Sequence, residues 1–479
     1  MPVPLPTPEG KQKEVLDLPE KGHYVVLGTA GSGKTTLAIH RAAYLAKRIK
    51  TDRKVLLVTF NKSLVTYLNS ISDNNLYKVD VRNYHWFARG YLDYRGMIKK
   101  WGDIVPSMDY NKENKKLTYI KMAIKEIIEE VGKNSTLSRN PEVFYEEICW
   151  IQKMGINTLD DYIDAERIGR SGTRVNRNNR KYFFAVYKRY LDIRERYDFH
   201  YDWDDLAHTV KEQLEDDEEQ RLYTHIVIDE GQDLSPVMLQ SLALAIPEDG
   251  SITFFGDVAQ QIYGGRISWR NAGLKVTKKE IWRFDQNYRN SKEIADLAIA
   301  ISKLPCFKQN VDLVTPKQPT ASGPKPVLAK LKDEVTELKW IIRNAPKLAK
   351  TETVAILVRT RQLVKKIRRI LSQKGIRYQE LDRDLKRWDS SPGISIGTYH
   401  SAKGLEFDTV LVPFCSADRI PDQEKITALE DREEALSEDA KLIYVAVTRA
   451  RRRLVLTYSG EMTEVIPESN SLYTIRELL

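Results

Sequence analysis

The sequence has few cysteines and no long hydrophobic run. Its three cysteines, Cys149, Cys306 and Cys415, lie too far apart for a CxxC pair, a zinc-ligand spacing or a disulfide framework, and they are too few for a four-thiolate iron–sulfur cluster. No stretch approaches about 18 consecutive apolar residues, so we expect no transmembrane helix and no membrane partner. The opening segment MPVPLP has no basic region followed by an apolar one, which argues against a secretory signal. We therefore expect a cytoplasmic protein in a reducing compartment.

Size and charge narrow the class of protein further. A chain of 479 residues has room for two to four domains, and 42% hydrophobic residues is typical of a globular protein. Lysine and arginine total 76 against 67 acidic residues, a net charge of +9 that mildly favours a polyanionic partner. On charge alone, ordinary solubility is the favoured explanation.

The N-terminal part alternates strand, loop, helix and strand. A β-branched run at 23–27 ends at a glycine, apolar residues recur at helical spacing over 37–49, and a second apolar run follows at 55–58. A strand–helix–strand unit with continuous apolar strands predicts a doubly wound α/β core with a parallel sheet.

The distribution of strand-like apolar runs along the chain predicts three parts. Strand-like runs disappear between about 91 and 217, where Lys, Glu, Ile and Tyr dominate, and they return afterwards. We therefore predict a first core from residues 1–90 and 218–282, a helical insertion at 91–217, and a second α/β core at 283–479.

A phosphate-binding loop lies between the first predicted strand and helix. Residues 28–35 read GTAGSGKT and match the pattern GxxxxGK[ST], whose backbone N–H groups and helix N-terminus hold phosphates. Lys34 would reach the β- and γ-phosphates of a nucleoside triphosphate and the Thr35 hydroxyl would bind Mg²⁺. The candidate nucleotide-binding residues are Gly28, Thr29, Ala30, Gly31, Ser32, Gly33, Lys34, Thr35 and Thr36. A glycine-rich turn without a ligand is the alternative.

Two carboxylates follow the apolar run at 226–228. Asp229 could hold Mg²⁺ and Glu230 could act as the base that activates the attacking water. An apolar strand followed by an acidic turn is common, so this pair alone is weak. Together with the phosphate-binding loop it predicts an NTPase that uses Mg²⁺.

Four further strings specify the kind of NTPase. They read GDVAQQIY at 256–263, QNYR at 286–289, TYHSAKGLEF at 398–407 and YVAVTRA at 444–450. In this order, and together with the phosphate-binding loop, they resemble the UvrD/PcrA/Rep group of superfamily 1 DNA helicases over nearly the whole chain. The resemblance implies two RecA-like P-loop NTPase cores, parallel sheets flanked by helices, with ATP between them.

The resemblance also implies roles at ATP. The implied residues are Gln12 at adenine, Tyr288 stacked on adenine, Glu406 at the ribose, Gln260 at the γ-phosphate, and Arg289 and Arg449 as the two arginines from the second core. Such arginines stabilise charge on the transferred phosphoryl group and make ATP a clamp between the cores. Surface charge for a lone arginine and packing for a lone tyrosine remain the alternatives.

A second set of residues is implied at DNA. These residues are Phe60, Asn61, His85, Tyr263, Arg266, Thr398, His400 and Lys403. Aromatic groups that stack on bases, with basic groups on phosphates, suit binding of single-stranded DNA, although each aromatic could instead pack in a core. Two positions depart from the family pattern. Asn83 replaces the usual threonine of a TxHxF-like string, and Gly265 replaces a stacking aromatic for which Trp269 is the candidate substitute.

The second core also departs from the full helicases. Those proteins carry a mobile subdomain, 2B, after a gIpY-like string, whereas here Gly375-Ile376-Arg377-Tyr378 is followed only by residues 379–392 before the next strand. Fourteen residues form a loop rather than a subdomain. In the insertion, arginines 167, 170, 174, 177 and 180 could form a phosphate-tracking patch or a flexible basic loop.

We therefore expect a DNA helicase or translocase whose ATPase is stimulated by single-stranded DNA or a tailed duplex and which moves 3′ to 5′. Lacking 2B, it could be the motor subunit that works with a separate nuclease or defence-complex subunit in phage defence or DNA repair. One alternative is a nucleotide-gated switch ATPase that acts on a defence or transcription complex without travelling on DNA. Another is an RNA translocase, because phosphate and base-face contacts do not separate RNA from DNA.

Overall fold

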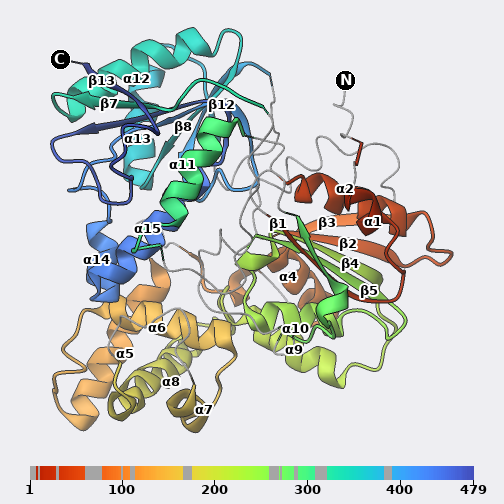
Figure 1. Cartoon of the computed structure of the whole chain (residues 1–479). Coiled ribbons are helices and arrows are strands. Elements are labelled where there is room, and N and C mark those ends of the chain that lie inside the picture. The colour runs from red at the N-terminus through yellow and green to blue at the C-terminus, as the bar shows by residue number, and fades with distance from the viewer. Residues whose placement is uncertain are drawn as a thin grey trace.

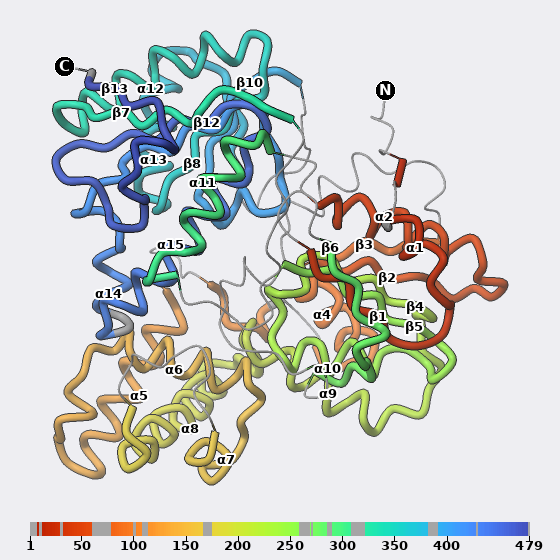
Figure 2. Tube along the Cα trace, in the orientation of Figure 1, coloured from red at the N-terminus to blue at the C-terminus, as the bar shows by residue number. Residues whose placement is uncertain are grey.

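The computed structural model describes residues 7–8, 11–28, 32–59, 78–98, 101–107, 114–165, 175–257, 269, 272–284, 290–307, 321–381 and 391–478. They form two parallel sheets, each flanked by helices, and a separate group of helices that lies below the second sheet in Figure 1. The predicted α/β architecture with two RecA-like cores and a helical insertion is thereby confirmed. Figure 2 traces the chain from the first sheet through the insertion and back before it enters the second sheet.

The first sheet has six strands in the order β3-β2-β4-β5-β1-β6, and every neighbouring pair is parallel. Its strands are β1 (Gly22–Gly28), β2 (Lys54–Thr59), β3 (Val79–Asn83), β4 (Tyr223–Asp229), β5 (Ser251–Gly256) and β6 (Ile281–Phe284). The central strands are buried on both faces, which is why their sequences read as continuous apolar runs. Because all strands point the same way, the ends of β1, β4 and β5 meet at one edge.

Helices cover both faces of the first sheet. One face carries α1 (Lys11–Leu16) and α2 (Lys34–Ala46), and the other carries α4 (Tyr84–Tyr94), α9 (Leu206–Asp216) and α10 (Pro236–Leu244). The predicted insertion, residues 91–217, includes α9, whereas the buried residues of α9 lie in the hydrophobic cluster of the first sheet. Their spacing at Leu206, Val210 and Leu214 gives one apolar stripe, which packs beside α4 and α10.

The insertion has a hydrophobic core of its own. Its helices are α5 (Lys115–Val131), α6 (Pro141–Met154), α7 (Leu159–Asp164) and α8 (Arg180–Arg196). Side chains of Asn114, Asn140 and Thr158 accept backbone N–H groups at the starts of α5, α6 and α7.

Short 3-10 helices occur in the insertion and in the first core. They are η2 (Trp101–Asp103) and η3 (Arg177–Asn179), and η4 (Gly231–Asp233) and η6 (Lys278–Glu280).

The second sheet has seven strands in the order β13-β7-β12-β11-β8-β10-β9, again all parallel. They are β7 (Val327–Leu331), β8 (Thr353–Val358), β9 (Gln379–Leu381), β10 (Gly393–Thr398), β11 (Phe407–Val412), β12 (Ala450–Ser459) and β13 (Thr474–Leu478). The sequence predicts that a loop at 379–392 replaces 2B. The first three of these residues, 379–381, instead form strand β9, which pairs with β10. Residues 382–390 lie outside the described part.

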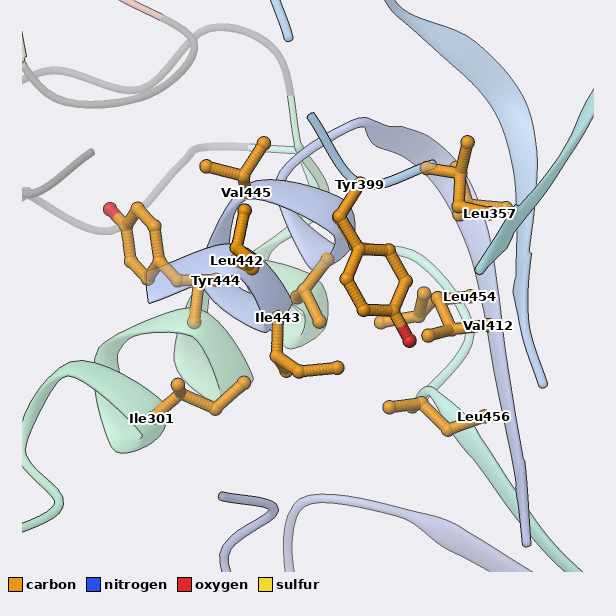
Figure 3. Packing of buried hydrophobic residues seen from close by; sticks show 14 of the residues in the cluster. Ile301, Leu357, Tyr399, Val412, Leu442, Ile443, Tyr444, Val445, Leu454 and Leu456 are labelled. Carbon is orange, nitrogen blue, oxygen red and sulfur yellow. The ribbon is translucent and has the colours of Figure 1, made fainter. Parts of the chain in front are cut away.

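Five helices accompany the second sheet. Helices α11 (Lys292–Ser302) and α15 (Arg432–Val447) pack on one face, α12 (Glu334–Leu348) and α13 (Arg361–Gln373) on the other, and α14 (Gln423–Leu429) precedes α15. Figure 3 shows the hydrophobic cluster between the second sheet and helices α11 and α15, where the Tyr399 ring lies among Leu357, Val412, Leu454 and Ile443. Tyr399 directly follows β10 and is 1% exposed, so it anchors the turn that carries His400 and Lys403.

The three parts contact one another. Lys403 of the second core donates to Asp233 of the first core at 2.5 Å. Helix α14 lies against α6 of the insertion, where Lys425 donates to Glu146 at 3.0 Å and Arg139 pairs with Glu430. Within the described ranges, no helix is both long and apolar enough to cross a bilayer.

Candidate functional site

The phosphate-binding loop joins β1 to α2, as its sequence predicts. Lys34 is 7% exposed; its Nζ donates to the Gly28 carbonyl oxygen at 2.9 Å and lies 3.9 Å from Asp257 Oδ2. A Cβ atom at Gly28 would lie 2.4 Å from Ser32 Oγ, and Gly33 adopts φ +78°. Gly28 is required because a side chain there would collide with Ser32, and Gly33 because other residues adopt this φ only at a cost. Lys34 follows directly, at the edge of the sheet.

Thr35 and Asp229 lie together beside this loop. The Thr35 hydroxyl donates to Asp229 Oδ1 at 3.4 Å, while the other carboxylate oxygen, Oδ2, is buried with no hydrogen-bond partner among the described residues. Burial, together with the charge of Glu230, raises the pKa of Asp229 to about 7. An unpartnered carboxylate oxygen next to a hydroxyl fits Mg²⁺, which takes few protein ligands and completes its shell with water and phosphate oxygens. Within the described ranges, no group of three or more Asp, Glu, His or Cys side chains is placed to hold a metal ion.

Glu230 is held in a strained and anionic form. Its backbone adopts φ +53°, a conformation that is costly for a residue other than glycine and that is enriched at functional sites. Burial acts to raise the pKa of its carboxyl, but Lys403, Lys34 and Arg449 together hold that pKa below its ordinary value. Gln232 Nε2 donates to Glu230 Oε2 at 2.5 Å, and Gln232 Oε1 accepts the backbone N–H of Asp257 at 2.9 Å. An anionic, oriented carboxylate is what a general base requires.

Gln232 and Asp233 are functional candidates that the sequence reasoning did not assign. Both occur in the string Asp229-Glu230-Gly231-Gln232-Asp233, so the signal was present in the residues directly after β4. Their roles depend on partners far away in the chain, Asp257 for Gln232 and Lys403 for Asp233. Asp257 is a third such candidate, because its carboxylate faces Lys34.

The second core supplies cations to this site. Arg449 is fully buried; its Nε donates to the Val445 carbonyl at 3.0 Å and its Nη2 to Thr448 Oγ1 at 3.2 Å, so the guanidinium is held in one orientation. Asn290 donates to the carbonyls of Thr448 and Ala450 at 3.1 and 2.6 Å. It thereby fastens the segment that follows Tyr288 and Arg289 to the residues flanking Arg449.

The remaining nucleotide candidates lie as follows. Gln12 Nε2 donates to the Ser32 carbonyl at 3.0 Å, which places this side chain against the phosphate-binding loop. Arg41 on α2 donates to the carbonyls of Leu16 and Leu18, each at 2.8 Å, and so fixes α1, which carries Gln12. Glu406 pairs with Arg451, whose Nε lies at 3.0 Å.

Two candidates for DNA binding, Thr398 and His400, lie at the end of β10 and in the turn that follows it. Thr398 Oγ1 accepts the backbone N–H of Ser401 at 3.2 Å. Burial, then Arg359, Lys403, Lys425 and Arg361, lower the pKa of His400 to about 3, so the imidazole is neutral. His400 could therefore donate or accept one hydrogen bond without carrying charge.

Two aromatic or polar candidates lie near α4. The His85 ring meets Trp203 edge-on at a centroid distance of 5.8 Å. Asn83 caps α4 by accepting the backbone N–H of Trp86 at 2.9 Å. Asparagine caps a helix as well as threonine does, which accounts for its place in the TxHxF-like string.

Trp269 packs edge-on against Phe254 at 5.0 Å between ring centroids and lies partly buried against the hydrophobic cluster of the first sheet. Its role as the substitute stacking aromatic stays a prediction. The structure contradicts one expectation, that Arg180 belongs to a phosphate-tracking patch. Arg180 is 5% exposed and donates to the carbonyls of Ile163 and Ala165 at 2.8 and 2.9 Å, so it caps α7 instead of tracking phosphates. For Arg180, contacts with backbone carbonyls 15 to 17 residues earlier in the chain decide the role.

Several predicted site residues lie outside the described part of the chain. They are Thr29, Ala30, Gly31, Phe60, Asn61, Gln260, Tyr263, Arg266, Tyr288 and Arg289. The arginines at 167, 170 and 174 lie outside it as well.

The Lys403–Asp233 pair gives a test of how the cores are joined. Lys403→Met should destabilise the protein by about 3–5 kcal/mol, because it leaves Asp233, 4% exposed, as a buried charge without its partner. The double variant Lys403→Met/Asp233→Leu should recover most of that loss. Urea unfolding measures both, with Lys211→Met in the exposed Lys211–Glu215 pair as the control, for which we expect less than about 1 kcal/mol. Equal losses for Lys403→Met and the control would contradict a buried bridge between the cores.

Comparison with known proteins identifies the family. Residues 9–285 match the family model for the UvrD/REP helicase N-terminal domain, and residues 282–386 and 379–461 match that for the UvrD-like helicase C-terminal domain. A probable DNA helicase II homolog of Mycoplasma capricolum is 22% identical over 376 residues, which are 74% of this chain and 49% of that protein. This chain therefore spans about half the length of that relative.

Another relative matches more of the chain. The ATP-dependent DNA helicase UvrD2 of Mycobacterium bovis is 21% identical over 570 residues, covering 94% of this chain and 78% of that protein. The crystal structure of the C-terminal domain of a possible DNA helicase from Lactobacillus plantarum is 19% identical and covers 39% of this chain, with a TM-score of 0.29 that supports no argument about fold. Because the two family models together span most of the chain, it belongs to the UvrD/Rep family of helicases.

Proposed function

We propose that this chain is an ATP-dependent DNA helicase or translocase whose ATP hydrolysis is stimulated by single-stranded DNA and which moves 3′ to 5′. The observation that carries the proposal is that residues of both cores interact at the end of β4. There the positive charges of Lys403 and Arg449, from the second core, stabilise the carboxylate of Glu230 in the first core. A site divided between two cores couples ATP binding and hydrolysis to their relative motion. The names of the relatives, DNA helicases, favour DNA as the substrate.

The residues suggest a division of labour at ATP. The phosphate-binding loop and Lys34 would bind the phosphates, and Thr35 and Asp229 would hold the metal. Mg²⁺, when bound, supplies positive charge that neutralises the phosphate oxygens. Glu230 would accept a proton from the attacking water, Gln232 would keep Glu230 oriented, and Arg449 would stabilise negative charge on the transferred phosphoryl group.

The compact second core supports a further proposal about partners. Strand β9 ends at residue 381 and β10 begins at residue 393, so only a short connection stands where full helicases carry 2B. We propose that the chain needs a partner for processive unwinding, and that a separate nuclease or defence-complex subunit in phage defence or DNA repair supplies it. Robust unwinding of a long tailed duplex by the purified chain alone would contradict this dependence.

A nucleotide-gated switch is the second candidate function. The buried Lys403–Asp233 contact favours it, because a bridge between cores can open and close on a protein partner without movement along DNA. An RNA translocase is the third. The ATPase assay described next distinguishes the three candidate functions.

Steady-state ATP hydrolysis with and without a single-stranded DNA oligonucleotide is the test. We expect stimulation of about tenfold or more, equivalent to about 1.4 kcal/mol of coupling, because DNA must favour the closed arrangement of the two cores. A matched RNA oligonucleotide serves as the comparison, and Glu230→Gln, which should bind ATP without hydrolysing it, is the control. A rate that DNA does not change would support the switch, and stronger stimulation by RNA would support the RNA translocase.

A further inference from the structure

The positive charge of the chain is concentrated in one segment of the second core. Residues 334–377, from the start of α12 to just beyond the end of α13, contain twelve lysines and arginines and three acidic residues, a net charge of +9. The whole chain also has a net charge of +9. Everything outside this segment is therefore electrically balanced, so general solubility does not account for the excess.

The two helices of this segment turn their charge outward. Helices α12 and α13 bury Leu338, Ile341 and Ile342, and Leu363, Val364 and Ile367, in the same hydrophobic cluster against one face of the sheet. Opposite those residues, each helix carries exposed basic side chains four residues apart. We call these the basic face: Lys339, Arg343 and Lys347 on α12, and Arg361, Lys365 and Arg369 on α13.

The basic face lacks internal compensation. Two neighbouring basic residues do form ion pairs, Lys366 with Glu334 and Arg368 with Glu380. The six residues of the basic face form no ion pair with any residue in the described ranges. Like charges at i and i+4 on a helix repel one another, so both helices would be more stable with acidic residues in these rows. An anionic ligand would remove that repulsion.

The basic face begins beside the turn predicted to bind DNA. Val358 at the end of β8 pairs with Thr398 at the end of β10 and accepts the backbone N–H of Tyr399 at 3.1 Å. Arg361 opens α13 three residues later, and its charge contributes to the low pKa of His400. From Arg361 to Arg369 the helix rises about 12 Å, which carries the positive charge away from the turn. Figure 1 shows α12 on the side of the second core opposite the insertion.

The chemistry of the basic face suits a duplex better than a single strand. Binding of single strands relies on aromatic side chains that stack on unpaired bases. On α12 the aromatic side chain is Trp340, which is half-buried and packs against the hydrophobic cluster, and α13 contains none. Rows of lysine and arginine without stacking groups match the contacts that proteins make to the phosphates of duplex DNA.

We propose that the basic face binds the phosphate backbone of duplex DNA, next to a single-stranded arm held at the turn after β10. The position of the single-stranded arm rests on the proposed function, whereas the duplex contact does not. In a chain without 2B, this face gives the second core a direct grip on the duplex. Its location on α12 and α13 makes the contact independent of the ATP site.

Two variants with equal changes in charge test the proposal. The basic-face variant carries Lys339→Gln, Arg343→Gln, Lys365→Gln and Arg369→Gln. The control carries Lys21→Gln, Lys47→Gln, Lys278→Gln and Lys279→Gln, exposed lysines around the starts of β1 and β6 and the end of α2, at the sheet edge opposite the phosphate-binding loop. Fluorescence anisotropy over a series of salt concentrations measures affinity for a blunt DNA duplex and for a single-stranded oligonucleotide.

We expect the basic-face variant to bind the blunt duplex at least about tenfold more weakly, with a salt slope smaller by about 0.9 for each phosphate that the variant no longer neutralises. Its affinity for single-stranded DNA and its DNA-stimulated ATPase should stay at the wild-type level, and the control should match the wild type throughout. Equal losses of affinity in both variants, or no loss in either, would overturn the proposal. Polyglutamate is a third ligand, which stands for an acidic protein segment. If the basic-face variant binds the duplex as the wild type does but binds polyglutamate more weakly, the proposal is overturned and the partner is an acidic protein. If the wild type shows no DNA-stimulated ATPase, the proposed function fails, while the blunt-duplex comparison still decides the role of the basic face.

Discussion

Replacing Arg449 by alanine should lower kcat for ATP hydrolysis by about 10³-fold or more while leaving nucleotide affinity nearly unchanged. Arginines that stabilise the transferred phosphoryl group contribute about 10³–10⁵ in rate, because their interaction is strongest when charge develops in the transition state. Arg449 is suited to this role because its Nε and Nη2 bonds fix the guanidinium and because its charge acts on Glu230 across the cores. Steady-state kinetics and titration with a fluorescent ATP analogue measure the two effects separately.

Two further variants keep this prediction sharp. Arg451→Ala removes an exposed arginine two residues further along the chain, whose partner is Glu406, and should change kcat by less than about tenfold. Arg449→Lys retains charge in the buried position but loses the fork of donors, so its rate should also fall even where its thermal unfolding resembles that of the wild type. Weakened nucleotide binding with an intact kcat in Arg449→Ala would contradict the assignment.

Replacing Lys34 by alanine should lower kcat/KM for ATP by about 10²–10³-fold, because one phosphate charge then lacks its partner in a water-poor site. Lys34 is buried beside Gly28 and Asp257, and a bound phosphate would compete for its ammonium group. The same variant should bind ATP more weakly, unlike Arg449→Ala. A coupled ATPase assay and equilibrium binding measure both quantities.

Lys47 provides the matched control for Lys34. It caps the opposite end of α2, where it is exposed, and Lys47→Ala should leave ATP turnover at the wild-type level. Unchanged turnover in Lys34→Ala would mean that the glycine-rich loop serves a structural purpose only. Equal losses in the two variants would point to α2 as a whole rather than to the phosphate contact.

The secondary structure around the ATP site follows from short-range information. The runs at 23–27, 55–58 and 226–228 form the buried parts of β1, β2 and β4, because strands buried on both faces of a parallel sheet need continuous apolar residues. The phosphate-binding loop is equally local, since its glycines and its lysine lie within eight consecutive residues. A single sequence therefore suffices to locate it.

Other assignments depend on partners that sequence spacing does not identify. Arg180 resembles a ligand-binding residue in the sequence, yet it caps α7. Amphipathic side chains such as arginine bury their apolar parts wherever the fold provides a surface, and that surface is formed by segments elsewhere in the chain. The role of Gln232, between Glu230 and Asp257, is invisible for the same reason.

By itself, the sequence determined that this protein has two α/β cores, a helical insertion and a nucleotide loop with an acidic pair beyond it. Those features rest on periodicity and on motifs whose members are close together in the chain. Only the tertiary structure decided that Lys403 meets Asp233, that Arg449 acts on Glu230, and that the basic rows of α12 and α13 share one face of the second core. The physical reason is that each of these arrangements depends on how separately formed helices and strands pack, and packing joins residues that are far apart in the sequence.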